Sequence, residues 1–470
     1  MKKAFISVFL ILAFTQVVFA EDITIEINDE VVVFEEPALI VEDRTMVPLK
    51  FLMDTLGYQV SWNAETYQVT ALRNTHEMLL TIGDETLIID GETYVSDVAP
   101  LIINDRTYVP LAIITRATGA DVTWISDTRT VVVSEKLSYL NMFYGKGAYK
   151  SYSEIEEQLD SVDQIAYAWS RVEMNDGQVL LNTTSINDNT MFYPDGHELV
   201  TSHQSPKLLN IYADQNYSLI FAQSEQLIQN IKTSLLSPEI DEPEFDGVVI
   251  DFENLKEENF EDYIKFIEAL NKAIPTMTLD VAVQPRAFAY ERVLPYVDHM
   301  ILMLHDYESK SEVIINFNQN YVEQPISPIE SIKRDLNQIV DSIQPWDRDK
   351  LILQINLSVV QWQGETLYEV NRYTPGYQKL IERMTELTFG DFYYDQNAKN
   401  PFLHYIDENE KINTIWYENE TSLQEKINLV FDYDLGGISI WQIGNLPSFD
   451  EIEAVDKYQI NLWQKILENN

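Results

Sequence analysis

The chain has 470 residues, of which 45% are hydrophobic and 11% aromatic, a composition that indicates a globular protein of two or three domains rather than a disordered or fibrous chain. It carries 76 acidic and 32 basic residues, and the formal net charge of -44 argues against nucleic acid or an anionic membrane surface as a partner, because both would repel it. Cysteine is absent, which excludes disulfides, thiolate metal sites and thiol nucleophiles.

The N-terminus resembles a secretory signal peptide. Lys2 and Lys3 precede an apolar run, which closes on the sequence V-F-A at residues 18–20 and is followed by two acidic residues. A basic start, an apolar stretch and a small residue at its end are the three parts of a cleavable export signal. We therefore interpret residues 1–20 as a signal peptide and expect the mature protein to be secreted or associated with the cell wall. An uncleaved membrane anchor is the alternative, for which the apolar run is slightly short.

Residues 22–135 contain an internal repeat. The sequence D-R-T-M-V-P-L at 43–49 recurs as D-R-T-Y-V-P-L at 105–111, and Trp62 recurs as Trp124 at the same offset of 62 residues. Each copy predicts short strands, an amphipathic helix that V-P-L opens, and a hairpin that holds the Trp, which together make a small duplicated α+β domain. We interpret the two Trp side chains as core residues, and a role as glycan-binding platforms is the alternative.

This repeat region resembles the copper amine oxidase N-terminal-like domain, also called a stalk domain, which is found on many exported bacterial proteins. The resemblance brings no metal chemistry with it, because His76 is the single His of the region and Cys is absent. We expect neither a metal nor a cofactor in the protein. The region is interpreted as a spacer or as a module for attachment to the cell wall.

Residues 138–470 alternate strand-like and helix-like segments, as βα units do. Amphipathic segments such as 261–274 and 329–343 separate the strands. The pattern predicts a (β/α)8 TIM barrel, with the aromatic stretch 363–420 as an insertion after strand seven that would form a flap beside the cleft. The eight expected strands centre on residues 140–144, 165–169, 208–212, 245–253, 277–283, 300–304, 351–355 and 437–441.

The fourth of these strands, F-D-G-V-V-I-D-F-E at 245–253, carries the candidate catalytic residues. Side chains alternate along a strand, so Val249, Asp251 and Glu253 are expected on one face. Two acids at the C-terminal end of a buried parallel strand lie where barrel enzymes place their chemistry, and mutual repulsion pushes their pKa values apart. The alternative is that the acids cap the following helix.

The same stretch resembles the D-G-x-D-x-D-x-E signature of the family 18 glycoside hydrolases, and above all the D-G-x-x-x-D-F-E form of the bacterial spore-cortex and peptidoglycan N-acetylglucosaminidases. Val249 departs from it, since the family usually has Asp or Asn there. The resemblance implies retaining, substrate-assisted cleavage beside an N-acetylglucosamine. Glu253 would be the general acid and Asp251 would orient the 2-acetamido group of the substrate, while Asp246 is counted among the substrate-binding residues.

Other strand ends supply further candidates for substrate binding. Strand six ends in M-L-H-D-Y, which resembles the M-x-Y-D of the family, so His305 would replace the Tyr that contacts the acetamido oxygen and Asp306 would bind the sugar. Trp441, at the end of strand eight, would form the floor of the sugar-binding subsite. Gln284 and Trp169, near the ends of strands five and two, are also candidates. Packing in the core or at a strand end is the alternative for these residues.

The sequence thus predicts an exported glycoside hydrolase of the N-acetylglucosaminidase or chitinase type. Its substrate would be a polysaccharide that contains N-acetylglucosamine, with peptidoglycan or spore cortex favoured over chitin. The alternative is a catalytically silent, lectin-like protein of the same fold: Glu253 favours the enzyme, whereas Val249 and His305 favour the silent protein. A further alternative is an interaction scaffold that acts through the stalk domain. The sequence does not distinguish endo from exo cleavage.

Overall fold

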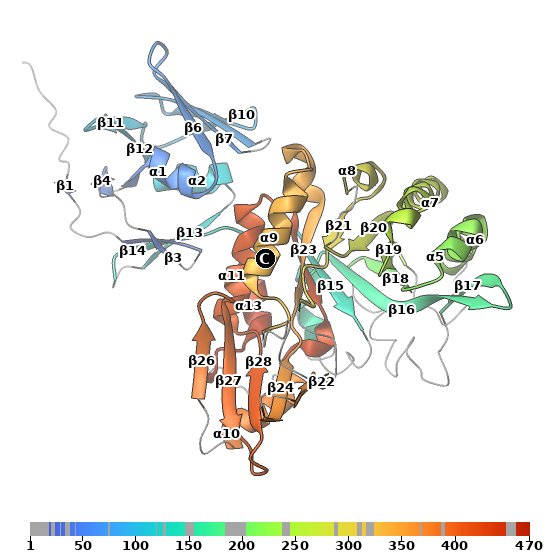
Figure 1. Cartoon of the computed structure of the whole chain (residues 1–470). Coiled ribbons are helices and arrows are strands. Elements are labelled where there is room, and N and C mark those ends of the chain that lie inside the picture. The colour runs from blue at the N-terminus through green and yellow to red at the C-terminus, as the bar shows by residue number, and fades with distance from the viewer. Residues whose placement is uncertain are drawn as a thin grey trace, which may run out of the picture. The chain divides into compact units, whose positions relative to one another are not determined.

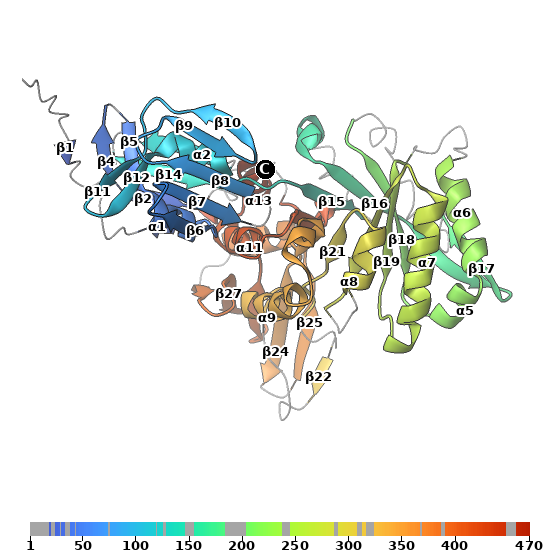
Figure 2. The same ribbon diagram turned by 90° about the horizontal axis from the view of Figure 1, so that it is seen from above.

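The computed structural model divides the chain into two compact units, Met1–Lys136 and Leu137–Asn470, and each is described here by itself (Figures 1 and 2). The predicted signal peptide falls almost wholly outside the described residues. No helix within the described ranges is both long and apolar enough to cross a membrane. The structure describes residues 18–19, 24–28, 30–32, 38–42, 44–73, 76–118, 120–125, 128–145, 155–183, 204–236, 245–285, 290–307, 313–315, 324–366, 369–386, 391–447 and 457–470.

Unit 1 consists of two equivalent series of elements and two additional strands. The additional strands are β1 (Val18–Phe19) and β8 (His76–Thr81). The first series is β2 (Thr24–Ile27), β3 (Glu30–Val32), β4 (Leu39–Val41), β5 (Arg44–Pro48), α1 (Leu49–Thr55), β6 (Gln59–Asn63) and β7 (Gln68–Arg73). The second series is β9 (Thr86–Ile89), β10 (Glu92–Val95), β11 (Leu101–Ile103), β12 (Arg106–Pro110), α2 (Leu111–Thr118), β13 (Asp121–Ile125) and β14 (Thr130–Ser134).

The two repeats of unit 1 form one domain with shared sheets, not two separate domains. Strands β5 and β12 pair antiparallel with Val47 opposite Val109, its own counterpart in the other repeat, as in a self-complementary two-fold contact. The sheet β13-β14-β2-β3 takes two strands from each repeat, and the sheet β10-β9-β8-β7-β6 does the same on either side of β8. The predicted duplicated α+β domain is confirmed, and each repeat needs the other to complete its sheets.

The prediction that Trp62 is a core residue is wrong. Its side chain is 45% exposed at the end of β6, which is an edge strand of its sheet. The core of unit 1 is aliphatic instead, and helix α1 contributes Leu49, Leu52 and Met53 to it. The side chain of Trp124 lies outside the described residues.

Unit 2 contains the predicted barrel. Its eight parallel strands pair in sequence, and a parallel contact between β15 and β16 closes the ring, to which β17 (Gln178–Asn182) adds an antiparallel edge on β16. Each strand lies where the sequence predicted it, although β16 continues well beyond its expected end. The eight strands are β15 (Leu140–Tyr144), β16 (Gln164–Asn175), β18 (Lys207–Ala213), β19 (Gly247–Phe252), β20 (Thr278–Val283), β21 (Met300–Leu302), β23 (Leu351–Asn356) and β29 (Gly437–Trp441).

Helices cover the outside of the barrel, and Figure 2 shows α6 and α7 beside β18 and β19. The α-helices of this layer are α5 (Tyr217–Ala222), α6 (Ser224–Leu236), α7 (Phe260–Ala273), α8 (Tyr290–Val293), α9 (Ile329–Val340), α11 (Glu420–Asp432) and α13 (Leu462–Asn469). Short 3-10 turns lie between the strands and helices of the barrel at η1 (Glu156–Ser161), η2 (Glu257–Asn259), η3 (Leu294–Tyr296), η4 (Pro345–Lys350) and η5 (Ile443–Asn445).

Strand β19 shows the predicted alternation of side chains. Phe252 stacks on Phe266 of α7 with ring centroids 5.7 Å apart, so this face of the strand packs against the outer helices. Val249 packs instead with Phe143, Ala282 and other side chains of the barrel interior. Asp251, two residues further on, therefore points into the barrel as expected.

The insertion after strand seven is confirmed, but it is a regular sheet and not an irregular flap. It starts at Val360, and the alternating apolar residues of V-Q-W-Q at 360–363 fit a strand with one buried face. A segment that precedes strand seven, β22 (Val313–Ile315), also joins it, giving the antiparallel order β22-β25-β24-β28-β27-β26. The other elements are β24 (Val360–Thr366), β25 (Glu369–Tyr373), α10 (Tyr377–Glu386), β26 (Asp391–Asp395), β27 (Asn400–Ile406) and β28 (Ile412–Trp416).

A buried ion pair connects this inserted sheet to the barrel layer. Lys426 of α11 is 0% exposed, and its Nζ lies 2.8 Å from Oε2 of Glu418, the residue two positions after β28. Asn400 at the start of β27 bonds both partners, and Ser422 donates to Glu418. Asn419 closes a capping box on α11 with Ser422. The W-Y-E-N stretch at 416–419 is therefore explained by packing and capping.

Candidate active site

Asp251 is a buried carboxyl group at the C-terminal end of β19. It is 4% exposed, and its Oδ2 accepts a hydrogen bond of 3.3 Å from Asn210 Nδ2 on the neighbouring strand β18. Within the described part of the chain, its Oδ1 has no hydrogen-bond partner. Burial and the negative charge of Glu253 raise the pKa of Asp251 to about 7, although the bond from Asn210 and the positive field of His305 oppose this rise. Near neutral pH the carboxyl group of Asp251 is therefore present in both its protonated and its ionised form.

Glu253 lies in the turn directly after β19 and is half-buried. Its backbone N–H donates to the carbonyl oxygen of Ala213 at 2.8 Å, and its own carbonyl oxygen accepts from the hydroxyl of Tyr217. Gln284, after β20, extends its Nε2 to within 3.5 Å of Glu253 Oε2 while its Oε1 accepts from the backbone N–H of Asn254 at 2.9 Å. Gln284 therefore links the turn after β19 to the carboxylate of Glu253. This position agrees with its predicted place near the acid pair.

His305 follows β21, and its charge acts on the acid pair. Its Nε2 donates to Gln354 Oε1 at 2.8 Å, and its Nδ1 faces Asp306 Oδ1 at 3.3 Å. Burial opposes a charge on the imidazole, but Asp306, Gln354 and Glu253 together raise the pKa of His305. Among the described residues Nδ1 is buried and has no hydrogen-bond partner. The contact of His305 with the acetamido oxygen of a sugar therefore stays a prediction.

Asp306 and Trp441 lie at the same end of the barrel as the acid pair. The side chain of Asp306 is 35% exposed and accepts a hydrogen bond of 3.3 Å from Asn356 Nδ2 at the end of β23. Trp441 is half-buried, its ring centroid lies 5.3 Å from that of Phe143, and it caps the apolar interior of the barrel. Both side chains are therefore partly accessible at the C-terminal rim.

Asp246 does not belong to this site. It precedes β19 at the opposite, N-terminal end, roughly 16 Å from Asp251 along an extended strand of about 3.3 Å per residue. Its carboxylate accepts from the backbone N–H of Lys207 at 2.8 Å, which fixes the start of β18. The assignment of Asp246 to substrate binding is corrected accordingly. Trp169 is also core, since it is 1% exposed and packs on Tyr167 with ring centroids 4.6 Å apart.

Several residues that the sequence analysis did not select complete the site. Asn210 and Gln354 are almost fully buried and bond Asp251 and His305 respectively. Tyr212 pairs in register with Asp251, and burial together with the charges of Glu253, Asp214 and Asp251 raises the pKa of its hydroxyl. The missed signal was a polar residue inside a predicted buried strand, as in L-L-N-I-Y at 208–212.

Among the described residues, no group of three or more His, Asp or Glu side chains is placed to hold a metal ion. A closed parallel barrel with two acids at the C-terminal end of strand four is an arrangement that glycoside hydrolases of the barrel class use. The chain belongs to the glycosyl hydrolases family 18, whose family model matches residues 140–445. Residues 26–133 match the copper amine oxidase N-terminal domain.

Among curated proteins, the chain is similar to the cortical fragment-lytic enzyme of Bacillus cereus, with 26% identity over 208 residues that cover 41% of this chain and 45% of that protein. It is also similar to the di-N-acetylchitobiase of Mus musculus, with 22% identity over 202 residues, 40% of this chain and 55% of that protein. The chain thus spans about half the length of the curated relatives it matches. The crystal structure of the Bacillus cereus spore cortex-lytic enzyme SleL shares the fold, with a TM-score of 0.54 and 20% identity over 77% of this chain and 82% of that one.

Proposed function

We propose that the protein hydrolyses polymers of β-linked N-acetylglucosamine outside the cell, with peptidoglycan or spore cortex as the substrate in preference to chitin. Support comes from family 18 membership and from relatives whose names refer to cortical fragments and to chitobiose. The N-terminal sequence supports export, and the stalk domain would attach the enzyme to the cell wall. The barrel would work without a metal or a cofactor.

The observation that carries the proposal is the pairing of a buried, readily protonated Asp251 with the more accessible Glu253. In substrate-assisted catalysis Glu253 gives a proton to the glycosidic oxygen while the acetamido oxygen of the substrate attacks the anomeric carbon. Asp251, once ionised, stabilises the positive charge that develops on the acetamido group. Water then opens the oxazolinium ring and configuration is retained.

The lectin-like alternative has one observation in its favour. Val249 provides no polar partner for Asp251, so one oxygen of that buried carboxyl group stays without a hydrogen bond among the described residues. A poorly supported Asp251 orients the acetamido group less well, and orientation accounts for much of the rate of such a reaction. A barrel that binds the sugar and does not cleave it would result.

The decisive experiment compares the parent protein with Glu253→Gln on soluble N-acetylglucosamine oligomers, peptidoglycan and cortex fragments, with NMR detection of the anomer released. We expect the parent to release the β-anomer and the variant to lose about 10²–10⁴-fold in kcat, because the amide cannot supply a proton. Parent activity should rise as the pH increases toward about 7, because Asp251 acts in its ionised form. Binding without any cleavage by the parent would establish the lectin-like alternative.

A further inference from the structure

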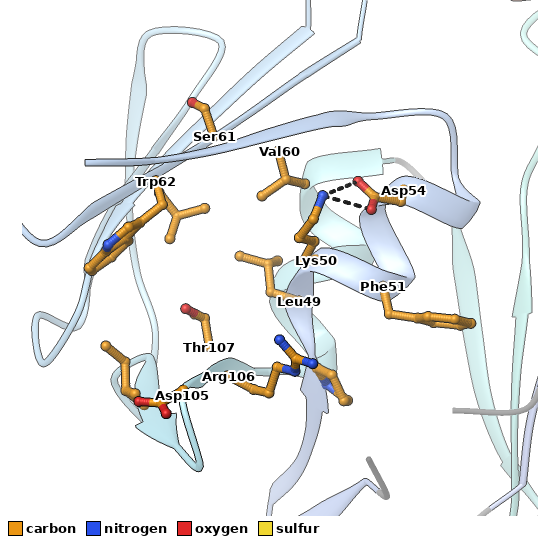
Figure 3. Close-up of a pocket in the computed structure, with 13 residues that line it drawn as sticks. Leu49, Lys50, Phe51, Asp54, Val60, Ser61, Trp62, Asp105, Arg106 and Thr107 are labelled. Atoms are coloured by element: carbon orange, nitrogen blue, oxygen red, sulfur yellow. Dashed lines mark hydrogen bonds and ion pairs between the residues drawn. The ribbon is translucent and has the colours of Figure 1, made fainter. Parts of the chain in front are cut away.

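Unit 1 carries a hollow of about 600 Å³, a volume typical of small-molecule sites. Leu49, Val60 and Val69 line it with apolar groups. Figure 3 shows the indole of Trp62 at one edge and the Lys50–Asp54 ion pair, 2.8 Å long, at another. Thr107 and Arg106, from the start of β12, add hydrogen-bonding groups. We call this hollow the Trp62 groove.

Trp62 is held in place and yet open to solvent. Its ring meets that of Tyr67 edge to face, with centroids 6.0 Å apart and an interplanar angle of 88°. An edge contact of this kind fixes the indole and leaves a ring face uncovered. The uncovered face of the Trp62 indole is therefore available to a ligand.

The residue set of the Trp62 groove is duplicated in the sequence. When residues 24–73 are aligned with 86–135 at the offset of 62, nine of the thirteen lining positions carry the same residue in both repeats, against eight of the other thirty-seven. The shared set includes Trp62, Arg106 and Thr107, which are at least partly exposed. Core packing does not account for keeping exposed side chains in both repeats, whereas a shared ligand does.

The charges at the groove suit an uncharged, hydrogen-bonding ligand. Arg44, the counterpart of Arg106, forms an ion pair with Asp97, whereas Arg106 has no ion-pair partner among the described residues. Its neighbour Asp105 and the Lys50–Asp54 pair leave little net charge at the rim. The net charge of -44 on the whole chain also works against a polyanion.

We propose that the Trp62 groove binds a strand of N-acetylated amino-sugar polymer, a ligand class that rests on the proposed function of the barrel. A pyranose ring would stack its apolar C–H face on the indole of Trp62, and Thr107 and Arg106 would hydrogen-bond its hydroxyl and amide oxygens. Unit 1 would then be a glycan-binding module with a defined site. Its contact would keep the enzyme on an insoluble polymer between cleavage events.

The test measures retention of the full chain on insoluble chitin and on purified peptidoglycan. Glu253→Gln and Trp441→Ala form the background, so that the polymer is not cleaved and the sugar platform of the barrel is removed. Adding Trp62→Ala should weaken the remaining retention by about tenfold, as expected when one aromatic stacking contact is lost. Trp62→Phe should restore part of it, and Trp346→Ala, which removes a Trp that is 63% exposed in unit 2, should change nothing.

Equal retention of the Trp62→Ala and Trp346→Ala proteins, or no retention of the background protein on either polymer, would overturn the groove proposal. Binding to peptidoglycan that depends on Trp62 but disappears when an amidase removes the peptide stems would show that the groove recognises the stems and not the sugar, and would overturn it too. Cleavage of soluble oligomers by the parent is measured separately, so failure of the groove and failure of the proposed function are told apart. Thermal melting checks that each variant is folded.

Discussion

At the scale of single residues, the raised pKa of Asp251 links the chemistry to stability. The folded protein binds this proton more tightly than the unfolded chain, so the contribution of Asp251 to stability is most favourable below pH 4 and is lost as the pH rises to about 7. Asp251→Asn should therefore be about 2–4 kcal/mol more stable than the parent at pH 8, at about 1.4 kcal/mol per pKa unit, and should lose this advantage near pH 4.

Denaturant unfolding at both pH values measures this difference. Asp262→Asn is a suitable control, since that carboxylate is 57% exposed and pairs with Lys265 on the surface of α7. If the gain in stability of Asp251→Asn over the parent is the same at pH 4 and pH 8, the carboxyl group of Asp251 is not held neutral by its surroundings.

Val249 offers a second test at this scale, because it occupies the inward position beside Asp251 without a polar group. In Val249→Asn the new amide would donate to Asp251 Oδ1, lower the pKa of that carboxyl group and orient it. We expect kcat on a soluble oligomer to rise severalfold and the acidic limb of the pH profile, where Asp251 ionises, to move to lower pH. Val249→Ala, which adds no donor, should show neither change. An unchanged kcat in well-folded Val249→Asn would mean that the orphaned oxygen does not limit the rate.

At the scale of elements, the link between the inserted sheet and α11 depends on the buried ion pair of Lys426 and Glu418. Removing Lys426 leaves Glu418 buried with one negative charge and only neutral partners, a change that costs about 3–5 kcal/mol. Lys426→Met should destabilise the protein by that amount in denaturant unfolding. Adding Glu418→Gln should recover most of the loss, because a neutral amide removes the buried charge, can still accept from Asn400 and can donate to the hydroxyl of Ser422. A loss below 1 kcal/mol for the single variant would show that water reaches the pair.

The elements also show what the sequence could and could not predict. Local rules placed the barrel strands and the inward direction of Asp251, because apolar runs and the two-residue period of a strand depend only on near neighbours. The contacts of His305 depend on Gln354, 49 residues away, and the exposure of Trp62 depends on which strand forms the sheet edge. Asp246 matched a motif, but its distance along the strand already placed it at the wrong end of the barrel.

At the scale of the whole molecule, the two proposals assign different tasks to the two units. The candidate catalytic residues and the strands that close the barrel all belong to unit 2, whereas the Trp62 groove belongs to unit 1. A protein that starts at Leu137 should therefore cleave a soluble N-acetylglucosamine oligomer with kcat and KM within about twofold of the parent. On insoluble polymer its rate at low enzyme concentration should fall by about tenfold, because a second contact that shares one chain multiplies retention. Initial rates on both substrates, with circular dichroism to confirm the fold, measure this. A collapse of kcat on the soluble oligomer in a folded barrel would mean that unit 1 takes part in catalysis.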